Sequence, residues 1–149
     1  MSAGIDIRPL RLDERAPWQV LWNSYLDFYK TSVPPEVYDA TWARLHDPKE
    51  PMWLLGGCVD GRLLGIVHFL YHRSCWTIGD YCYLQDLFVA DEARKRGLGR
   101  ALIEAVYREA RAAGASRVHW LTHETNATAR ALYDQLADRP GFIQYRRLF

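Results

Sequence analysis

Apolar residues recur with a helical period in the first third of the chain. The stripe consists of large side chains at steps of three and four residues: Trp18, Leu21, Trp22, Tyr25, Phe28 and Tyr29. This pattern predicts an amphipathic helix that begins after Asp13, its expected N-cap, and reaches about Lys30. A second helix is predicted to start at Pro34-Pro35-Glu36 and to end near Leu45.

Shorter apolar runs predict strands on either side of these helices. Ile5–Arg8 is a short strand, and the runs Met52–Val59 and Arg62–Tyr71 are joined by Asp60-Gly61, a strong signal for a β-hairpin. A further strand, Tyr83–Val89, follows. Strict alternation of side chains along this strand predicts two faces. One carries Tyr83, Gln85, Leu87 and Val89, and the other carries Cys82, Leu84, Asp86 and Phe88.

The second half of the chain continues with alternating helices and strands. A helix is predicted from Gly97 to about Ala113, a strand over Val118–Leu121, and a helix capped by Thr125 or Asn126 that runs to about Leu136. The tail Phe142–Phe149 is predicted to be a last strand. The strand–helix–strand unit in the middle implies a parallel pair with a right-handed crossover, so we expect an α/β (α+β) fold with a mixed sheet and flanking helices.

Composition narrows the class of protein. The chain has 149 residues, which predicts one domain over residues 1–149, and its formal net charge of +1 gives no reason to expect nucleic acid or membrane partners. No apolar run reaches the roughly 20 residues of a membrane span, and the N-terminus does not resemble a signal peptide. The odd set of cysteines (Cys58, Cys75 and Cys82) predicts reduced thiols in a cytoplasmic protein. Neither cysteines nor histidines show metal-ligand spacing, so we expect no metal.

The segment Arg94-Lys95-Arg96-Gly97-Leu98-Gly99-Arg100 stands between a strand and a helix. Glycines at such a turn let the backbone approach an anion, and the free amides and dipole of the helix N-terminus point at it. The basic side chains add countercharge. The segment therefore predicts a diphosphate site, whereas packing glycines and solvated arginines are the structural alternative.

Two motifs resemble the GNAT family of N-acetyltransferases. The first is Arg94-x-x-Gly97-x-Gly99, which resembles the family's Arg/Gln-x-x-Gly-x-Gly/Ala turn in the same strand–helix context. The second is Asn126-x-x-Ala129-x-x-x-Tyr133, followed by Gly141-Phe142, with an insertion at Ala137–Pro140 relative to the commonest spacing. The segments around Tyr83–Val89 and Trp120–Asn126 are most similar to the polyamine and histone-type amine acetyltransferases.

The resemblance implies a fold, a cofactor and roles for particular residues. It implies a single-domain GNAT fold with a splayed parallel strand pair, and acetyl-CoA as the donor. The residues implied to bind this cofactor are Leu87, Phe88, Val89, Arg94, Lys95, Arg96, Gly97, Leu98, Gly99, Arg100, Asn126 and Tyr133. It also implies that Tyr133 protonates the departing thiolate, and that an N–H of Leu87 or Phe88 faces the thioester oxygen. No cysteine lies in the motifs, which favours direct transfer in a ternary complex.

The acceptor side is less clearly marked in the sequence. Gln85 stands where polyamine-type relatives often carry Glu, and because an amide cannot accept a proton it could at most hold a water. His123 and Glu124 are the candidate bases, with Asp86 as a third residue to which a structural role is better suited. The aromatic residues expected to bind the acceptor are Trp22, Tyr25, Tyr29 and Tyr83.

The sequence leaves several alternatives open. The leading prediction is acetyl transfer to a primary amine: a polyamine, another small-molecule amine or a protein lysine. A non-catalytic acyl-CoA sensor on the same fold is the alternative. A Rossmann-type nucleotide domain ranks last, because its Gly-rich turn would follow the first strand. A homodimer could form through the tail.

Overall fold

The computed structural model describes residues 4–149, and its centre is one five-stranded sheet in the order β1-β2-β3-β4-β5. The strands are β1 (Ile5–Arg8), β2 (Met52–Val59), β3 (Arg62–His72), β4 (Tyr81–Val89) and β5 (Arg117–His119). The first four strands pair antiparallel and β4 pairs parallel with β5. This is the mixed, mostly antiparallel sheet expected from the sequence.

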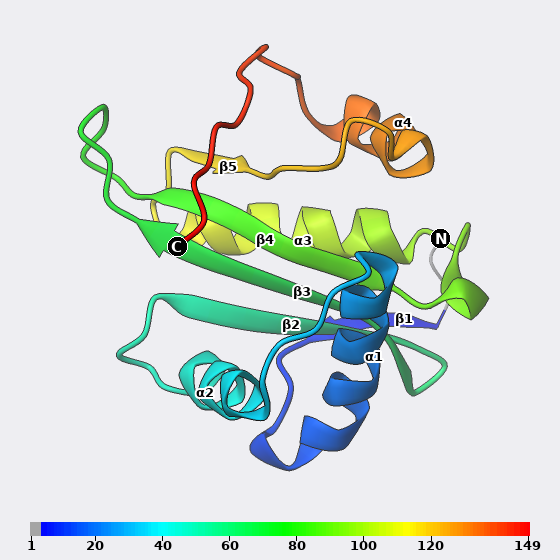
Figure 1. Ribbon diagram of the computed structural model, residues 1–149. Coiled ribbons are helices and arrows are strands. Elements are labelled where there is room, and N and C mark those ends of the chain that lie inside the picture. Colours follow the sequence, from blue (N-terminus) through cyan, green and yellow to red (C-terminus); the bar gives the residue numbers. More distant parts are fainter. Residues whose placement is uncertain (1–3) are drawn as a thin grey trace.

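Helices cover both faces of this sheet (Figure 1). They are α1 (Arg15–Phe28), α2 (Pro35–Leu45), α3 (Leu98–Ala112) and α4 (Ala127–Leu136), with short 3₁₀ turns η1 (Leu12–Glu14) and η2 (Asp91–Ala93). α1 and α2 lie on one face, α3 lies on the other, and α4 lies beyond the β5 edge. None of the helices in residues 4–149 has the length and apolar character needed to cross a membrane.

The hairpin between β2 and β3 forms where the sequence predicts it. Asp60 and Gly61 have φ values of 50° and 83°. Two successive positive φ values are what the tight hairpin turn favoured by an Asp-Gly pair requires. The turn sets the register of the two long central strands, which pair from Met52↔Leu70 to Val59↔Arg62.

Two hydrophobic cores lie on opposite faces of the sheet. α3 buries Leu98, Leu102, Ile103 and Val106 against one face, and α1 and α2 bury Trp18, Trp22 and Trp42 against the other. Gly57 allows α3 to approach closely, because a Cβ there would lie 2.6 Å from Leu98 Cδ1. The N-terminus of α3, where the basic turn ends, is thereby held against the sheet.

A β-bulge at Gln85 corrects the simple alternation expected for β4. Phe69 pairs with Leu84 and His68 pairs with Asp86, so Gln85 is the extra residue. The bulge shifts which residues share a face. Cys82, Leu84, Leu87 and Val89 now face α3, whereas Tyr83, Asp86 and Phe88 face α1 and α2.

β4 and β5 separate after a short paired stretch. Only Tyr81, Cys82 and Tyr83 pair with β5, and the strand continues to Val89 without a partner on that side. The edge of β4 at Leu87–Val89 is therefore open, which confirms the expected splayed parallel pair. Unpaired N–H and C=O groups are available there for a ligand.

The start of α1 differs from the expected N-cap. Asp13 lies within η1, and α1 begins at Arg15 with Glu14 at its N-cap position. The preceding turn is instead closed by Glu14, which accepts from the Arg11 N–H at 2.8 Å and from Arg8 at 2.9 Å. A 3₁₀ turn thus replaces the first helical turn.

The prediction of a last strand over Phe142–Phe149 is wrong for this structure. Residues 137–149 contain no regular secondary structure, and the large apolar side chains of the tail are exposed. An alternating sequence forms a strand only where a neighbouring edge supplies hydrogen-bond partners, and within residues 4–149 the tail pairs with none.

Candidate active site

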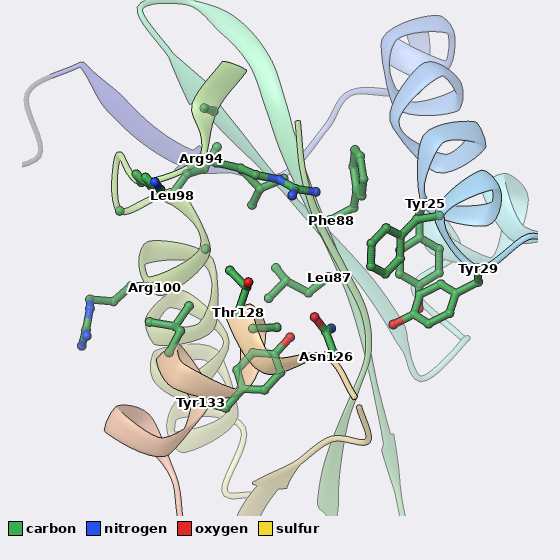
Figure 2. Close-up of a pocket in the computed structure, with 18 residues that line it drawn as sticks. Tyr25, Tyr29, Leu87, Phe88, Arg94, Leu98, Arg100, Asn126, Thr128 and Tyr133 are labelled. Atoms are coloured by element: carbon green, nitrogen blue, oxygen red, sulfur yellow. The ribbon is translucent and has the colours of Figure 1, made fainter. Parts of the chain in front are cut away.

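One cavity of about 640 Å³ opens beside the free edge of β4. Its walls come from α1, β4, the basic turn with the start of α3, and α4 (Figure 2). Of the cofactor residues expected from the sequence, all except Arg96 line it: Leu87, Phe88, Val89, Arg94, Lys95, Gly97, Leu98, Gly99, Arg100, Asn126 and Tyr133. Segments from four parts of the chain therefore meet around one space.

The backbone of the turn is shaped to bind an anion. Gly97 is the N-cap of α3 with φ 84°, and the first helical bond runs from the Ala101 N–H to the Gly97 carbonyl at 3.0 Å. The N–H groups of Leu98, Gly99 and Arg100 consequently have no acceptor within the helix. These amides and the positive end of the helix dipole face the cavity region, which suits a phosphate group.

The basic side chains of the turn differ in their contacts and in whether they line the cavity. Arg94 and Lys95 line the cavity, and Arg94 forms an exposed ion pair with Asp91 at 3.0 Å. Arg100 lines it by its position, but its guanidinium bonds to Gln135 and lies near Glu104, and in Figure 2 it points away from β4. Arg96 lies 3.9 Å from Asp60 instead. Arg94 and Lys95 are therefore the countercharges nearest the open space.

α4 supplies the polar groups of the opposite wall. Asn126 occupies the N-cap position of α4, but its side chain makes no capping bond and donates to Thr122 Oγ1 at 3.3 Å. Tyr133 lies two turns further along the helix, against Trp120, with ring centroids 5.4 Å apart. Burial, followed by the neighbouring Tyr29, raises the pKa of Tyr133 to about 12. Its hydroxyl is thus protonated at neutral pH and can serve as an acid.

Thr128 is a lining residue that the sequence reasoning missed. It lies on the first turn of α4, and Figure 2 shows its side chain in the space between α3 and β4. The helical spacing from Thr128 to Leu132 was the available signal, because residues four apart share a face.

Two of the four aromatic residues expected at the acceptor line the cavity. Tyr25 and Tyr29 do so, with ring centroids 5.0 Å apart. Trp22 is buried behind them and stacks on Tyr25, also at 5.0 Å. Tyr83 lies outside the lining and stacks on His119 at 5.2 Å. The cavity thus has an aromatic end, opposite the basic turn.

The residues expected to handle the amine proton lie outside this lining. Gln85 is exposed at the bulge of β4. His123 and Glu124 are exposed in the loop before α4, where His123 Nδ1 is 2.8 Å from Thr125 Oγ1. In residues 4–149 no group of three or more His, Cys, Asp or Glu side chains has the arrangement of a metal site.

The site fits an acyl-CoA on its own geometry. Free helix amides and two cationic side chains suit the diphosphate, the open edge of β4 can pair with the amides of the pantetheine arm, and Tyr133 lies between that edge and α4. These features lie in one continuous cavity in the order that such a ligand requires.

Comparison with known proteins agrees with this geometry. The chain is 39% identical over 137 residues to the D-amino-acid N-acetyltransferase HPA3 of Saccharomyces cerevisiae, an alignment that covers 91% of this chain and 84% of that protein. It is 36% identical over 87 residues to the thialysine N-epsilon-acetyltransferase of Caenorhabditis elegans, with 55% of this chain and 54% of that one covered.

A solved structure shares the same fold. The ribosomal-protein-alanine N-acetyltransferase of Brucella melitensis biovar Abortus 2308 superposes with a TM-score of 0.82 at 25% identity, covering 97% of this chain and 99% of that one. The family model for the acetyltransferase (GNAT) family matches residues 18–137, a range that includes the basic turn and Tyr133. The chain therefore belongs to the GNAT family of acetyltransferases, enzymes whose acyl donor is acetyl-CoA.

Proposed function

We propose that this enzyme transfers the acetyl group of acetyl-CoA to a primary amine, by direct transfer in a ternary complex. The observation that carries the proposal is the continuity of one cavity from the basic turn to the tyrosines of α1. The acceptor classes are a polyamine, another small-molecule amine such as an amino acid, or a protein lysine. The names of the relatives, which act on D-amino acids and thialysine, support an amine.

The donor would be held mainly by backbone groups. We assign the diphosphate to the N–H groups of Leu98, Gly99 and Arg100, with Arg94 and Lys95 as countercharges. The open edge of β4 at Leu87–Val89 would pair with the pantetheine arm as an added strand does. An N–H of Leu87 or Phe88 would then donate to the thioester oxygen, a contribution of a few kcal/mol when the donor is preorganised.

The transfer itself needs a neutral amine and a protonated leaving group. The amine nitrogen forms a bond to the carbonyl carbon, and the carbon–sulfur bond breaks. Tyr133 gives its proton to the departing thiolate, the nitrogen releases one proton to water as the amide forms, and Tyr133 recovers a proton from solvent. No cysteine of residues 4–149 lines the cavity, and Cys58 and Cys82 are buried in the core. This supports direct attack of the amine on the donor.

The amine must lose a proton, because an alkylammonium with a pKa near about 10.4 is almost fully charged at pH 7. We assign this step to the side chains named from the sequence: Gln85 holds a water, and His123 or Glu124 accepts the proton. Because all three are exposed and outside the cavity lining, each would act through water.

We also propose a homodimer that uses the tail. Phe142, Ile143, Tyr145, Leu148 and Phe149 are all exposed, and such a concentration of apolar surface is typical of an interaction site. A second copy of the tail would supply the strand partner that is missing within one chain.

The test measures release of the CoA thiol with acetyl-CoA and a panel of amines: spermidine, D-lysine, thialysine, a lysine peptide and an aminoglycoside. We expect turnover on at least one amine, and a fall in kcat of about 10²–10⁴-fold in Tyr133→Phe. Tyr71→Phe is the matched control, because burial also raises the pKa of Tyr71 to about 12 but its ring lies outside the cavity lining.

Two outcomes would contradict the proposal. Turnover that survives Tyr133→Phe would remove Tyr133 from the acid role. Tight acetyl-CoA binding without transfer to any amine would favour the acyl-CoA sensor, which uses the same cavity without the reaction.

A further inference from the structure

A chain of three polar side chains crosses the core beneath the aromatic end of the cavity. The Trp18 Nε1–H of α1 donates to His68 Nε2 of β3 at 3.0 Å, and His68 Nδ1 lies 3.1 Å from Asp86 Oδ2 of β4. Trp18 is fully buried, and His68 is 5% exposed, the one buried polar or charged residue of the described chain. The side chain of Asp86 is 14% exposed. None of these three residues lines the cavity, and the proposed reaction assigns no role to them.

The order of the three residues determines where the protons lie. An indole N–H can only donate, so His68 Nε2 must be the unprotonated acceptor. The other ring nitrogen, Nδ1, then carries the proton and donates it to Asp86. The imidazole is therefore neutral, and Asp86 is the acceptor, an ionised carboxylate whose charge no imidazolium cancels.

The bulge at Gln85 brings Asp86 to the face of β4 that carries Tyr83 and meets α1. After burial, the negative charge of Asp86 raises the pKa of Tyr25, Tyr29 and Tyr83, and a hydrogen bond to Asp86 adds to this effect at Tyr25. Two of these tyrosines line the cavity. The carboxylate thus lies directly behind its aromatic end.

The surroundings of Asp86 lack a cation. The titratable groups that face it are His68 from β3, Tyr25 from α1, Tyr29 at the C-cap of α1, and Tyr83 within β4. Within the described part of the chain, no lysine or arginine forms an ion pair with it. A buried carboxylate without a cationic partner is unfavourable, so a cation brought by a ligand would be stabilised there.

We propose that Asp86 binds the ammonium group of the acceptor, and that Trp18 and His68 keep the carboxylate charged and oriented for this task. This inference rests on the proposed acetylation of an amine and assigns its specificity: the enzyme selects an acceptor that arrives as a cation. The rings of Tyr25 and Tyr29 add cation–π attraction at the same place. Trp18 and His68 are positioning residues, since they act through Asp86.

The first test compares two ligands of nearly equal shape and different charge. n-Pentylamine is a cation at pH 7, whereas O-butylhydroxylamine, in which an oxygen replaces one CH₂, is neutral. Their binding to the protein saturated with CoA would be measured by calorimetry, so the result does not depend on turnover. We expect Asp86→Asn to weaken n-pentylamine binding at least tenfold and to change O-butylhydroxylamine binding less than threefold.

These measurements separate the inference from the proposed function. Equal losses for both ligands, no loss for either, or no binding of n-pentylamine to the wild type would overturn the inference, even where amine turnover is observed. If n-pentylamine binds through Asp86 but no amine of the panel is acetylated, the proposed function fails and the cation site stands.

The second test reads the histidine tautomer by ¹⁵N NMR of the imidazole. We expect His68 to be the Nδ1–H tautomer in the wild type. Trp18→Phe removes the indole donor, so Nε2 becomes free to bind a proton. The resulting imidazolium would neutralise Asp86, and n-pentylamine binding should weaken as the pH falls and recover as it rises.

Trp42→Phe is the matched control. Trp42 packs on Trp18 with ring centroids 4.9 Å apart and is also buried, so the substitution removes the same volume from the same core. We expect it to leave the tautomer and the pH dependence of binding unchanged. An Nε2–H tautomer in the wild type, or the same pH dependence of n-pentylamine binding in both variants, would overturn the positioning role. If Trp18→Phe does not fold, the tautomer measured in the wild type decides the question by itself.

Discussion

The two ends of the cavity are built by different means. At the donor end, the groups that meet a ligand are mainly backbone amides, at the start of α3 and along the open edge of β4. At the acceptor end they are side chains of α1, supported by the Trp18–His68–Asp86 chain in the core. Backbone sites tolerate changes of side chain, whereas a buried polar network does not. We therefore expect substitutions at the two ends to have different signatures.

The largest effect on stability should come from the acceptor end. His68→Leu leaves the Trp18 N–H buried without a partner and removes the Nδ1–H bond to the Asp86 carboxylate, which should lower the free energy of unfolding by about 3 kcal/mol. Urea denaturation would measure it. Leu70→Ala, on the same strand but nearer its end, controls for a general weakening of β3, and a loss below 1 kcal/mol in His68→Leu would show that the network contributes little.

A cationic side chain at the donor end should affect binding but not stability. Arg94→Gln removes a countercharge that lines the cavity and whose ion pair with Asp91 is exposed. We expect the KM for acetyl-CoA to rise about tenfold, with the free energy of unfolding changed by less than about 0.5 kcal/mol. Arg62→Gln is the control, since Arg62 makes an exposed ion pair with Glu92 away from the cavity lining. An equal rise in KM in both variants would argue against a specific role for Arg94.

The pH dependence of kcat, which reports on Tyr133 between the two ends of the cavity, should be shallow on the alkaline side. Tyr133 acts in its protonated form, and burial raises its pKa to about 12. Activity limited by this acid is present below that pH and is lost as the pH rises through it. With saturating amine, we expect kcat to fall less than twofold between pH 8 and pH 10. A half-maximal kcat near pH 10, the ordinary value for tyrosine, would contradict the buried donor.

The smallest effect on either end should come from removing the tail. A chain that stops at Gly141 loses the exposed apolar residues of 142–149. We expect light scattering to show a monomer in place of the dimer, with acetyl-CoA binding and the unfolding of the remaining chain nearly unchanged. If the truncated protein loses acetyl-CoA binding, the tail contributes to the donor end in the assembled protein.

The sequence predicts the donor end well because its determinants are local. Gly97 carries the positive φ that the basic turn before α3 needs. Elsewhere in the sheet, Asp60-Gly61 is likewise sufficient to predict the β2–β3 hairpin. Each of these features depends on residues adjacent in the chain. The motif around Asn126 and Tyr133 likewise brings its residues to the cavity through the regular spacing of one helix.

The acceptor end could not be predicted in the same way, because its determinants are far apart in the sequence. Trp18 and His68 are separated by 50 residues, and His68 and Asp86 by 18. The bulge at Gln85 depends on the register of β4 against β3, and alternation along one strand contains no information about it. His68, inside the apolar run of β3, was the available signal, but the spacing of residues along one strand does not indicate which side chains it meets on α1 and β4.

The bulge at Gln85 also bears on how this family can vary. Deleting that one residue would leave Leu84 and Asp86 adjacent and paired with Phe69 and His68 as they are now, so Leu87, Phe88 and Val89 would keep their faces. Replacing its exposed side chain would disturb neither core. In descent from a common ancestor, this position should therefore vary more freely than the residues that flank it. Position 85 thus offers evolution a way to alter the chemistry at the rim of the site without changing the fold.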